Sequence, residues 1–128
     1  SAWQDAEKIR RTNNLERLTN ICGDVNRELP LFAERYAGKN VTVVVDPPRK
    51  GLDEKTRRTL IELNPRTLIY VSCDSATLAR DAAHFVSAGF SLDLVRPYDM
   101  FPNTKHVETL VVLSKKIPDS QIGIRNRN

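Results

Sequence analysis

The sequence predicts an α/β fold whose sheet is mostly parallel and whose last strand runs antiparallel. Two apolar runs, at residues 41–45 and 67–71, have the length and composition of buried strands, and a helical pattern follows each of them. Two later runs, at 90–96 and 107–113, are joined by a loop instead of a helix. Alternation of strands with helices favours parallel pairing, whereas a loop connection allows the final strand to run the other way.

Three elements are expected before the first of these strands. Residues 3–14 predict a surface helix with one apolar edge, because apolar side chains recur there at helical spacing among charges. Residues 18–22 predict a short strand that ends in a Gly-Asp turn. Residues 29–36 predict a helix that Gly38 stops.

The strand at 41–45 runs directly into Asp46-Pro47-Pro48. Two consecutive prolines lack N–H donors and have a fixed φ, so this segment must be a stiff turn. Such a turn would hold Asp46 in one place at the carboxyl end of the strand, although these residues alone are equally consistent with an aspartate that only caps a turn. A helix is then expected from an N-cap at Asp53 to about residue 64.

The stretch 67–81 organises the rest of the chain, because its strand leads through Ser72-Cys73-Asp74-Ser75 into an amphipathic helix that Gly89 closes. Cys73 therefore lies at a strand-to-helix junction, with Asp74 or Ser75 as the N-cap. Ligands of open α/β sheets bind at such carboxyl ends, and the start of a helix lowers the pKa of a nearby thiol. A free cysteine is also often a small buried hydrophobe, so both interpretations remain open at this point.

Composition restricts the class of protein. The 128 residues suffice for one domain, and no apolar run is long enough to cross a membrane. The N-terminus lacks the basic and apolar regions of a signal peptide, and Cys22 and Cys73 have no framework spacing, so a reduced, cytoplasmic protein is expected. The net charge of +4 permits a polyanionic partner without requiring one. We expect residues 118–128 to form a disordered basic tail rather than an RNA-binding one.

Three segments resemble the signature segments of one family when they are taken together. They are DPPRKGL (46–52), YVSCDSATLARD (70–81) and DMFPNTKHVE (99–108). In this order and at this spacing they resemble the S-adenosylmethionine-dependent RNA uracil-C5 methyltransferases, which act on tRNA and ribosomal RNA. The resemblance runs from about residue 3 to residue 115, and TNNLERLTNICGDV looks like the family's helix and third strand.

The resemblance implies a covalent mechanism that suits the chemistry of uracil. C5 of uracil is a poor nucleophile, so a thiolate must first add at C6 and a base must later remove the C5 proton. By position, the resemblance makes Cys73 the nucleophile and Glu108 the base. His106 is expected to be a helper at best and more simply a surface residue.

The same resemblance implies binding roles for four further residues. Asp46 would lie near both the methyl donor and the uracil, and Asp24 would meet the adenosyl group, although an aspartate after a glycine is equally typical of a turn. Arg49 and Arg80 would bind substrate by steadying the enolate or a phosphate, because guanidinium groups suit oxyanions.

The fold implied is a partial Rossmann-like methyltransferase fold that lacks its first two strands. The five glycines include no G-x-G pair, and neither the glycine-rich turn nor the ribose-binding acidic residue is found. Residues 1–117 are therefore expected to be the carboxyl-terminal part of a methyltransferase catalytic domain, with an incomplete S-adenosylmethionine pocket, and to be inactive alone. The family's missing strands would lie between residues 18–22 and 41–45, so the exposed edge could drive self-association and the strand at 18–22 should be loosely held.

Three other functions compete with this interpretation. A non-catalytic RNA-binding or subunit-interaction module would use the same half-fold. An amino-methyltransferase would use Asp46-Pro47-Pro48 but normally has an aromatic residue where this chain has Arg49. A cysteine hydrolase would need a histidine base, for which only His84 and His106 are available. The sequence does not indicate which RNA or which uridine would be the substrate.

Overall fold

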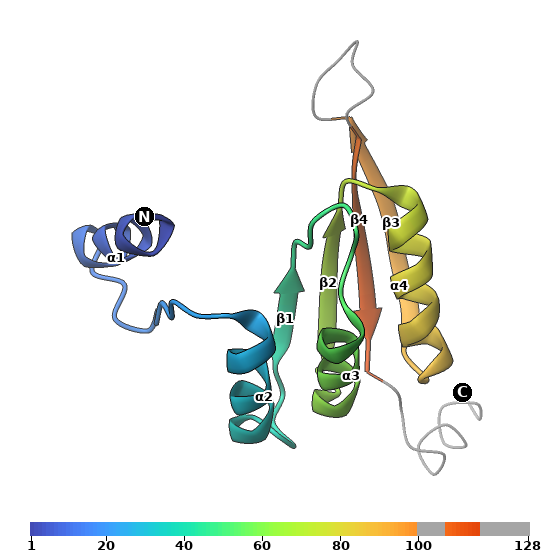
Figure 1. Cartoon of the computed structure of the whole chain (residues 1–128), viewed down its shortest axis with the longest axis horizontal. Coiled ribbons are helices and arrows are strands. Elements are labelled where there is room, and N and C mark those ends of the chain that lie inside the picture. The colour runs from blue at the N-terminus through green and yellow to red at the C-terminus, as the bar shows by residue number, and fades with distance from the viewer. Residues whose placement is uncertain (100–106, 116–128) are drawn as a thin grey trace, which may run out of the picture.

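The computed structural model describes residues 1–99 and 107–115, which form a four-stranded sheet with two helices packed on one face (Figure 1). The elements in chain order are α1 (Ala2–Thr12), α2 (Val25–Arg35), β1 (Thr42–Val45), α3 (Glu54–Leu63), β2 (Thr67–Ser72), α4 (Ser75–Ser87), β3 (Ser91–Asp99) and β4 (Val107–Ser114). The order of strands across the sheet is β1-β2-β4-β3.

The predicted α/β class and the antiparallel last strand are confirmed. β1 and β2 pair in parallel, whereas β4 lies between β2 and β3 and is antiparallel to both. Three of the described strands therefore run in one direction, and β4 alone is reversed. The predicted strand at 90–96 extends to Asp99, with a register irregularity between Leu92 and Leu94, so Pro97 lies within an edge strand.

The core lies between the sheet and helices α3 and α4. Alternate residues of β2 and β4 point toward these helices and are fully buried, as are apolar residues on the facing sides of the helices. Phe85 of α4 meets Phe90 edge to face, with ring centroids 5.7 Å apart. The main cluster comprises Leu60, Leu68, Tyr70, Leu78, Phe85, Phe90, Val111 and Leu113.

The opposite face of the sheet has no helix over it in the described part of the chain (Figure 1). The register places Val44, Ile69 and Val112 side by side on this face. The side chain of Val44, on the edge strand β1, is 63% exposed. One face of the sheet thus forms a packed core, and the other presents apolar side chains that are only partly covered.

The predicted strand at residues 18–22 is wrong. This segment has no regular structure, and Leu18 and Ile21 are 43% and 49% exposed. A strand needs a neighbour to accept and donate backbone hydrogen bonds, and these residues instead fold back on α1, where Asn20 accepts from the Trp3 indole at 3.2 Å. Figure 1 shows α1 standing apart from the sheet, as expected for the surface helix predicted at 3–14.

The other predicted helices are confirmed, with one change of boundary. α2 begins at residue 25 rather than 29, because Asp24 caps it by accepting a hydrogen bond from the Asn26 amide at 2.9 Å. Asp53 caps α3 in the same way through the Thr56 amide at 2.8 Å. Residues 100–106, which include His106, and the predicted tail at 118–128 lie outside the described residues.

Replacing Phe85 with alanine should lower the free energy of unfolding by about 3–5 kcal/mol, because Phe85 is fully buried and its removal leaves a cavity. The neighbouring Val86 is 45% exposed, so Val86→Ala should change it by only about 0.5 kcal/mol and serves as the control. Urea unfolding of the two variants measures the difference. Equal losses would mean that the core is not where the structure places it.

Candidate active site

Three of the sequence-predicted segments meet at one end of the sheet, where β1 and β2 end and β4 begins. Asp46 directly follows β1 and Cys73 directly follows β2, so both lie at carboxyl ends of parallel strands. β4 runs the other way, and the pairing of Thr109 with Ser72 brings the amino end of β4 to the same end of the sheet. Cys73 and Glu108 occupy the next positions beyond that pair. The antiparallel strand therefore brings together the proposed nucleophile and base, which are 35 positions apart in the sequence.

The segment after β1 is a compact turn, as the two prolines predict. The Gly51 amide donates to the Pro48 carbonyl at 2.8 Å, and Gly51 has a φ of +79°. A Cβ atom at Gly51 would lie 2.5 Å from both the Arg80 guanidinium and the Asp81 carboxylate. Only glycine therefore fits here, since it tolerates the left-handed backbone and leaves room for these side chains.

Cys73 lies in the tight junction between β2 and α4 and is partly buried. Ser72 Oγ accepts from the Asp74 amide at 3.0 Å and donates to the Asp74 carbonyl oxygen at 2.8 Å, which closes the backbone around Cys73. Asp74, rather than Ser75, is the N-cap of α4 and accepts from the Thr77 amide at 3.0 Å. That hydrogen bond lowers the pKa of Asp74, so the carboxylate beside Cys73 stays ionised at neutral pH.

Glu108 is the second residue of β4 and pairs with Tyr98 of β3. Its neighbour Thr109 pairs with Ser72, whose side chain is buried on the helix-covered face. Because side chains alternate along a strand, Glu108 lies on the face that no helix covers, at the end of the sheet where β2 ends. Its side chain is partly buried.

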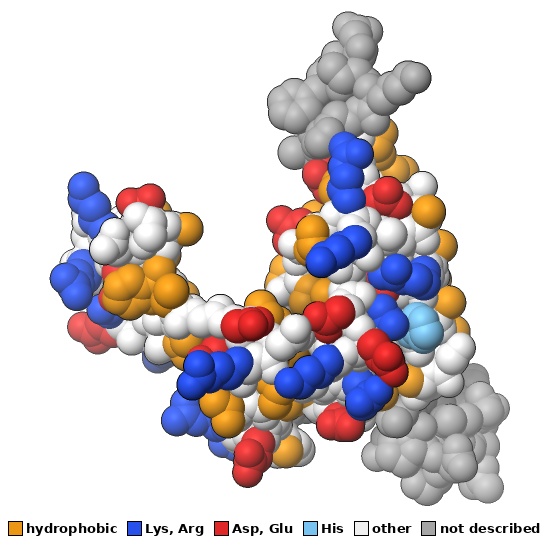
Figure 2. Space-filling model, viewed as in Figure 1, with side chains coloured by type: hydrophobic (Ala, Val, Ile, Leu, Met, Phe, Trp, Pro, Cys, Tyr) orange, Lys and Arg blue, Asp and Glu red, His pale blue; other side chains and the backbone are white. Residues whose placement is uncertain are grey.

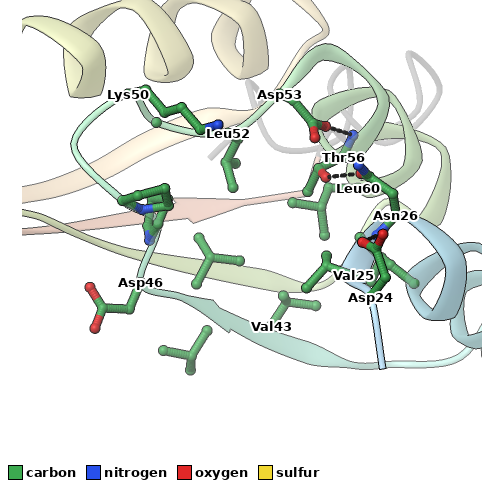
Figure 3. Close-up of a pocket in the computed structure, with 16 residues that line it drawn as sticks. Asp24, Val25, Asn26, Val43, Asp46, Lys50, Leu52, Asp53, Thr56 and Leu60 are labelled. Carbon is green, nitrogen blue, oxygen red and sulfur yellow. Dashed lines mark hydrogen bonds between the residues drawn. The ribbon is translucent and has the colours of Figure 1, made fainter. Parts of the chain in front are cut away.

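A cavity of about 520 Å³ lies between β1, the 46–53 segment, α3 and the start of α2 (Figure 3). Its wall is mostly apolar and includes Val43, Leu52 and Leu60. Polar groups gather at its α2 end, where Thr56 Oγ1 donates to Asn26 Oδ1 at 3.0 Å. The Thr56 amide lowers the pKa of Asp53 in the same cluster. An apolar wall suits the face of a flat heterocycle, and acidic groups at the rim can accept hydrogen bonds from the polar parts of a ligand.

The structure brings Asp24 and Asp46 to this one cavity, at opposite ends of it (Figure 3). Asp24 is exposed and caps α2, and Asp46 is exposed at the end of β1 with its carboxylate turned away from the apolar wall. Cys73 and Glu108 do not line the cavity. The arrangement thus separates a candidate cofactor side, at β1, from a candidate reaction side, at β2 and β4.

Arg49 and Arg80 differ in how they are held. Arg49 is exposed, and its carbonyl oxygen accepts from Thr77 Oγ1 at 2.8 Å. The Arg80 guanidinium is bound to the protein itself, since Nη2 donates to the Lys50 carbonyl at 2.7 Å and to Asp81 Oδ1 at 3.1 Å. Arg80 therefore ties α4 to the turn, and a contact of Arg80 with substrate remains a prediction.

Sequence reasoning gave no role to Asp81, whose carboxylate is fully buried at the centre of these contacts. It accepts hydrogen bonds from Leu52, Arg57, Tyr70 and Arg80. One signal was available, because Asp81 lies on the same side of α4 as Leu78 and Phe85. A carboxylate on the core-facing side of a helix must have partners inside the protein.

Charge and hydropathy of the surface agree with the composition. Figure 2 shows Lys and Arg side chains spread over the helix-covered face with Asp and Glu between them, rather than gathered in one basic patch. None of the helices within residues 1–99 and 107–115 has the length and hydrophobicity to span a membrane.

Comparison with known proteins identifies the family. Residues 11–116 match the model of the tRNA (uracil-5-)-methyltransferase family, which is most of the chain. The chain belongs to the tRNA (uracil-5-)-methyltransferase family. It is 43% identical over 116 residues to an uncharacterised RNA methyltransferase of Enterococcus faecalis, and 40% identical over 114 residues to one of Clostridium acetobutylicum. These matches cover 91% and 89% of this chain and 25% of each relative, so the chain spans about a quarter of their length.

A solved member of the family has the same fold. The tRNA (uracil-54, C5)-methyltransferase of Pyrococcus abyssi, determined in complex with S-adenosyl-L-homocysteine, superposes with a TM-score of 0.62 at 30% identity. The match covers 84% of this chain and 25% of that one. The resemblance to uracil-C5 methyltransferases is thereby confirmed at the level of family and fold.

Gly51→Ala should destabilise this chain more than Gly38→Ala does. Both glycines have positive φ, +79° and +75°, but a Cβ atom at Gly38 meets nothing within 4 Å. Gly38→Ala should therefore cost only the backbone strain, about 1–2 kcal/mol, and Gly51→Ala about 1–3 kcal/mol more because of overpacking. Chemical denaturation of both variants checks this, and equal losses would contradict the close packing of the turn on α4.

Proposed function

We propose that this chain is the carboxyl-terminal part of a longer enzyme that transfers a methyl group from S-adenosylmethionine to C5 of a uridine in tRNA or ribosomal RNA. One observation carries the proposal: the Ser72–Thr109 pair sets Cys73 and Glu108 at adjacent positions, at the same end of the sheet as the Asp46 turn. Membership of the family and the S-adenosyl-L-homocysteine bound to the Pyrococcus abyssi relative support it.

In the proposed reaction, the Cys73 thiolate adds to C6 of the uracil. A C6–S bond forms, and the electron pair of the C5–C6 double bond moves to give an enolate. S-adenosylmethionine supplies an electrophilic methyl group, which C5 takes up. The Glu108 carboxylate then removes the C5 proton, the double bond reforms, and the thiolate leaves. The protein supplies only a nucleophile and a base, and Cys73 returns unchanged.

Binding roles follow from the two sides of the site. Asp46 lines the cavity and directly follows β1, at the same end of the sheet as Cys73, so we assign it contacts with both methyl donor and uracil. Asp24, at the far end of the cavity, is assigned to the adenosyl part. Exposed Arg49 is the better placed of the two arginines to meet a phosphate, because Arg80 already uses its guanidinium for Lys50 and Asp81.

The residues present fit only part of S-adenosylmethionine. The cavity supplies an apolar wall and two carboxylates, but it lies along β1, which is one of the two edge strands of the described sheet. β1 has four uncharged residues, Thr-Val-Val-Val, whereas the other edge, β3, carries Arg96, Pro97 and a register irregularity, which protect an edge from pairing. We infer that a further strand of the longer enzyme pairs with β1 and completes the cofactor site.

The isolated chain should bind S-adenosylmethionine at least about tenfold more weakly than the longer protein does, which is a difference of about 1.4 kcal/mol. Its unprotected β1 edge should also make it self-associate as its concentration rises. Calorimetry with both proteins and light scattering of the isolated chain measure these two effects. Equal affinity in a strict monomer would contradict the inferred strand.

The reaction itself is tested by trapping. The longer protein is mixed with S-adenosylmethionine and RNA that contains 5-fluorouridine, in which fluorine cannot leave C5 as a proton does. We expect a covalent protein–RNA complex that Cys73→Ala abolishes and the control Cys22→Ala retains, because Cys22 is exposed and lies 51 positions before Cys73 in the sequence. With ordinary uridine RNA, Glu108→Gln should accumulate the corresponding adduct, in which the methylated C5 still carries its hydrogen.

Transfer RNA and ribosomal RNA should both be tried in that experiment. If RNA binds with unchanged affinity to wild type and Cys73→Ala, and no covalent complex forms with either RNA, the chain belongs to a non-catalytic RNA-binding module and the proposal fails.

A further inference from the structure

The centre of this inference is the Asp81 carboxylate, which is fully buried beneath the turn that follows β1. Oδ2 accepts from the Leu52 amide at 2.9 Å and from the Tyr70 hydroxyl at 2.5 Å. Oδ1 accepts from Arg57 Nη1 at 3.2 Å and from Arg80 Nη2 at 3.1 Å. A buried carboxylate is stable only when its oxygens are satisfied in this way.

The same groups hold both backbone atoms of Leu52. While Asp81 binds its amide, the Leu52 carbonyl oxygen accepts from Arg57 Nη1 at 2.6 Å and from Arg80 at 3.4 Å. Arg80 also binds the Lys50 carbonyl. The last residues of the Asp46 turn are thus fixed by side chains from α3 and α4, and Tyr70 of β2 in turn holds Asp81.

A second tie joins the turn to the junction that contains Cys73. Thr77 Oγ1 donates to the Arg49 carbonyl at 2.8 Å, and the amide of the same Thr77 donates to Asp74 Oδ1 at 3.0 Å. Tyr70 stands three residues before Cys73 on β2 and reaches Asp81. The turn with Asp46 and the junction with Cys73 are therefore held to the same residues of α4.

We propose that Asp81, with Tyr70 and Thr77, positions the two reacting segments of the methyltransferase relative to each other. The inference rests on the proposed function. Asp81 touches neither RNA nor methyl donor, so it acts as a positioning residue. It fixes the Asp46 turn, which has no strand pairing of its own, against the Cys73 junction.

The magnitude of the effect follows from the geometry that addition requires. A displacement of about 1 Å between reacting groups costs on the order of 100-fold in rate. Loss of one hydrogen bond in the network leaves the other contacts in place, and we expect it to slow the reaction about tenfold. RNA affinity should change little, because RNA binding depends mainly on exposed cations rather than on the relative placement of the two segments.

The test uses the longer protein and measures two quantities for each variant. These are the single-turnover rate of covalent complex formation with 5-fluorouridine RNA at saturating S-adenosylmethionine, and the dissociation constant for the same RNA. Tyr70→Phe removes only the hydroxyl that binds Asp81. Thr77→Val removes only the hydroxyl that donates to the Arg49 carbonyl and, at the longer distance of 3.3 Å, to Asp74. Both changes keep the volume of the side chain, so the variants should fold even if Asp81→Asn does not.

Thr59→Val is the matched control. Its hydroxyl donates to the Lys55 carbonyl of its own helix at 2.9 Å, which is the same kind of hydrogen bond as that of Thr77, away from the turn. We expect Tyr70→Phe and Thr77→Val to slow trapping about tenfold with less than about a twofold change in RNA affinity, and Thr59→Val to leave both unchanged. Exchange of the Leu52 amide should also become faster in Tyr70→Phe but not in Thr59→Val.

The outcomes separate the two proposals. If wild type traps RNA and both network variants trap it as fast as Thr59→Val does, the positioning role is wrong while the proposed function stands. If the variants lose rate and RNA affinity equally, the network serves binding and the positioning role is again wrong. If wild type forms no covalent complex, the proposed function itself fails.

Discussion

The antiparallel pairing of β4 with β2 determines where the chemistry of this chain can lie. A parallel β4 would place Glu108 near the amino end of β2, at the opposite end of the sheet from Cys73. The register is fixed by the core, because Val111 and Leu113 are buried on the helix-covered face while Val112 between them is not. A slip of one residue would expose both. The packing that stabilises the fold therefore also sets the position of Glu108 relative to Cys73.

The turn after β1 depends on a different constraint. Pro47 and Pro48 cannot donate hydrogen bonds, and the segment leaves the sheet, so its backbone groups must find partners elsewhere. Asp81 and the arginines beside it provide those partners, and Gly51 allows them to approach. Burial raises the pKa of Tyr70, and its hydrogen bond to Asp81 raises it further, so the hydroxyl keeps its proton and remains a donor.

Sequence periodicity predicted the elements that stabilise themselves by local pattern. The strand at 41–45 and the strand and capped helix across Cys73 have strong periodicity and capping residues, and the structure has them within a few residues. The strand at 18–22 failed, because a strand also needs a neighbour, and Leu18 and Ile21 found none among the described residues. The Asp81 network was missed for a related reason: three of its four partners lie 11 to 29 positions away in the sequence, and no local pattern indicates such contacts.

The two sides of the candidate site therefore differ in how firmly they are built. Cys73 directly follows β2 and Glu108 lies in β4, and these two inner strands contribute buried side chains to the core. The cavity with Asp24 and Asp46 lies along β1, a four-residue edge strand with an exposed Val44. Because cooperative stability decreases toward edges with few buried contacts, the reaction side should keep its geometry in the isolated chain while the cofactor side should open first. Under the proposed function, the chain would keep the proposed nucleophile and base in place and yet depend on the inferred strand at β1 to hold the methyl donor.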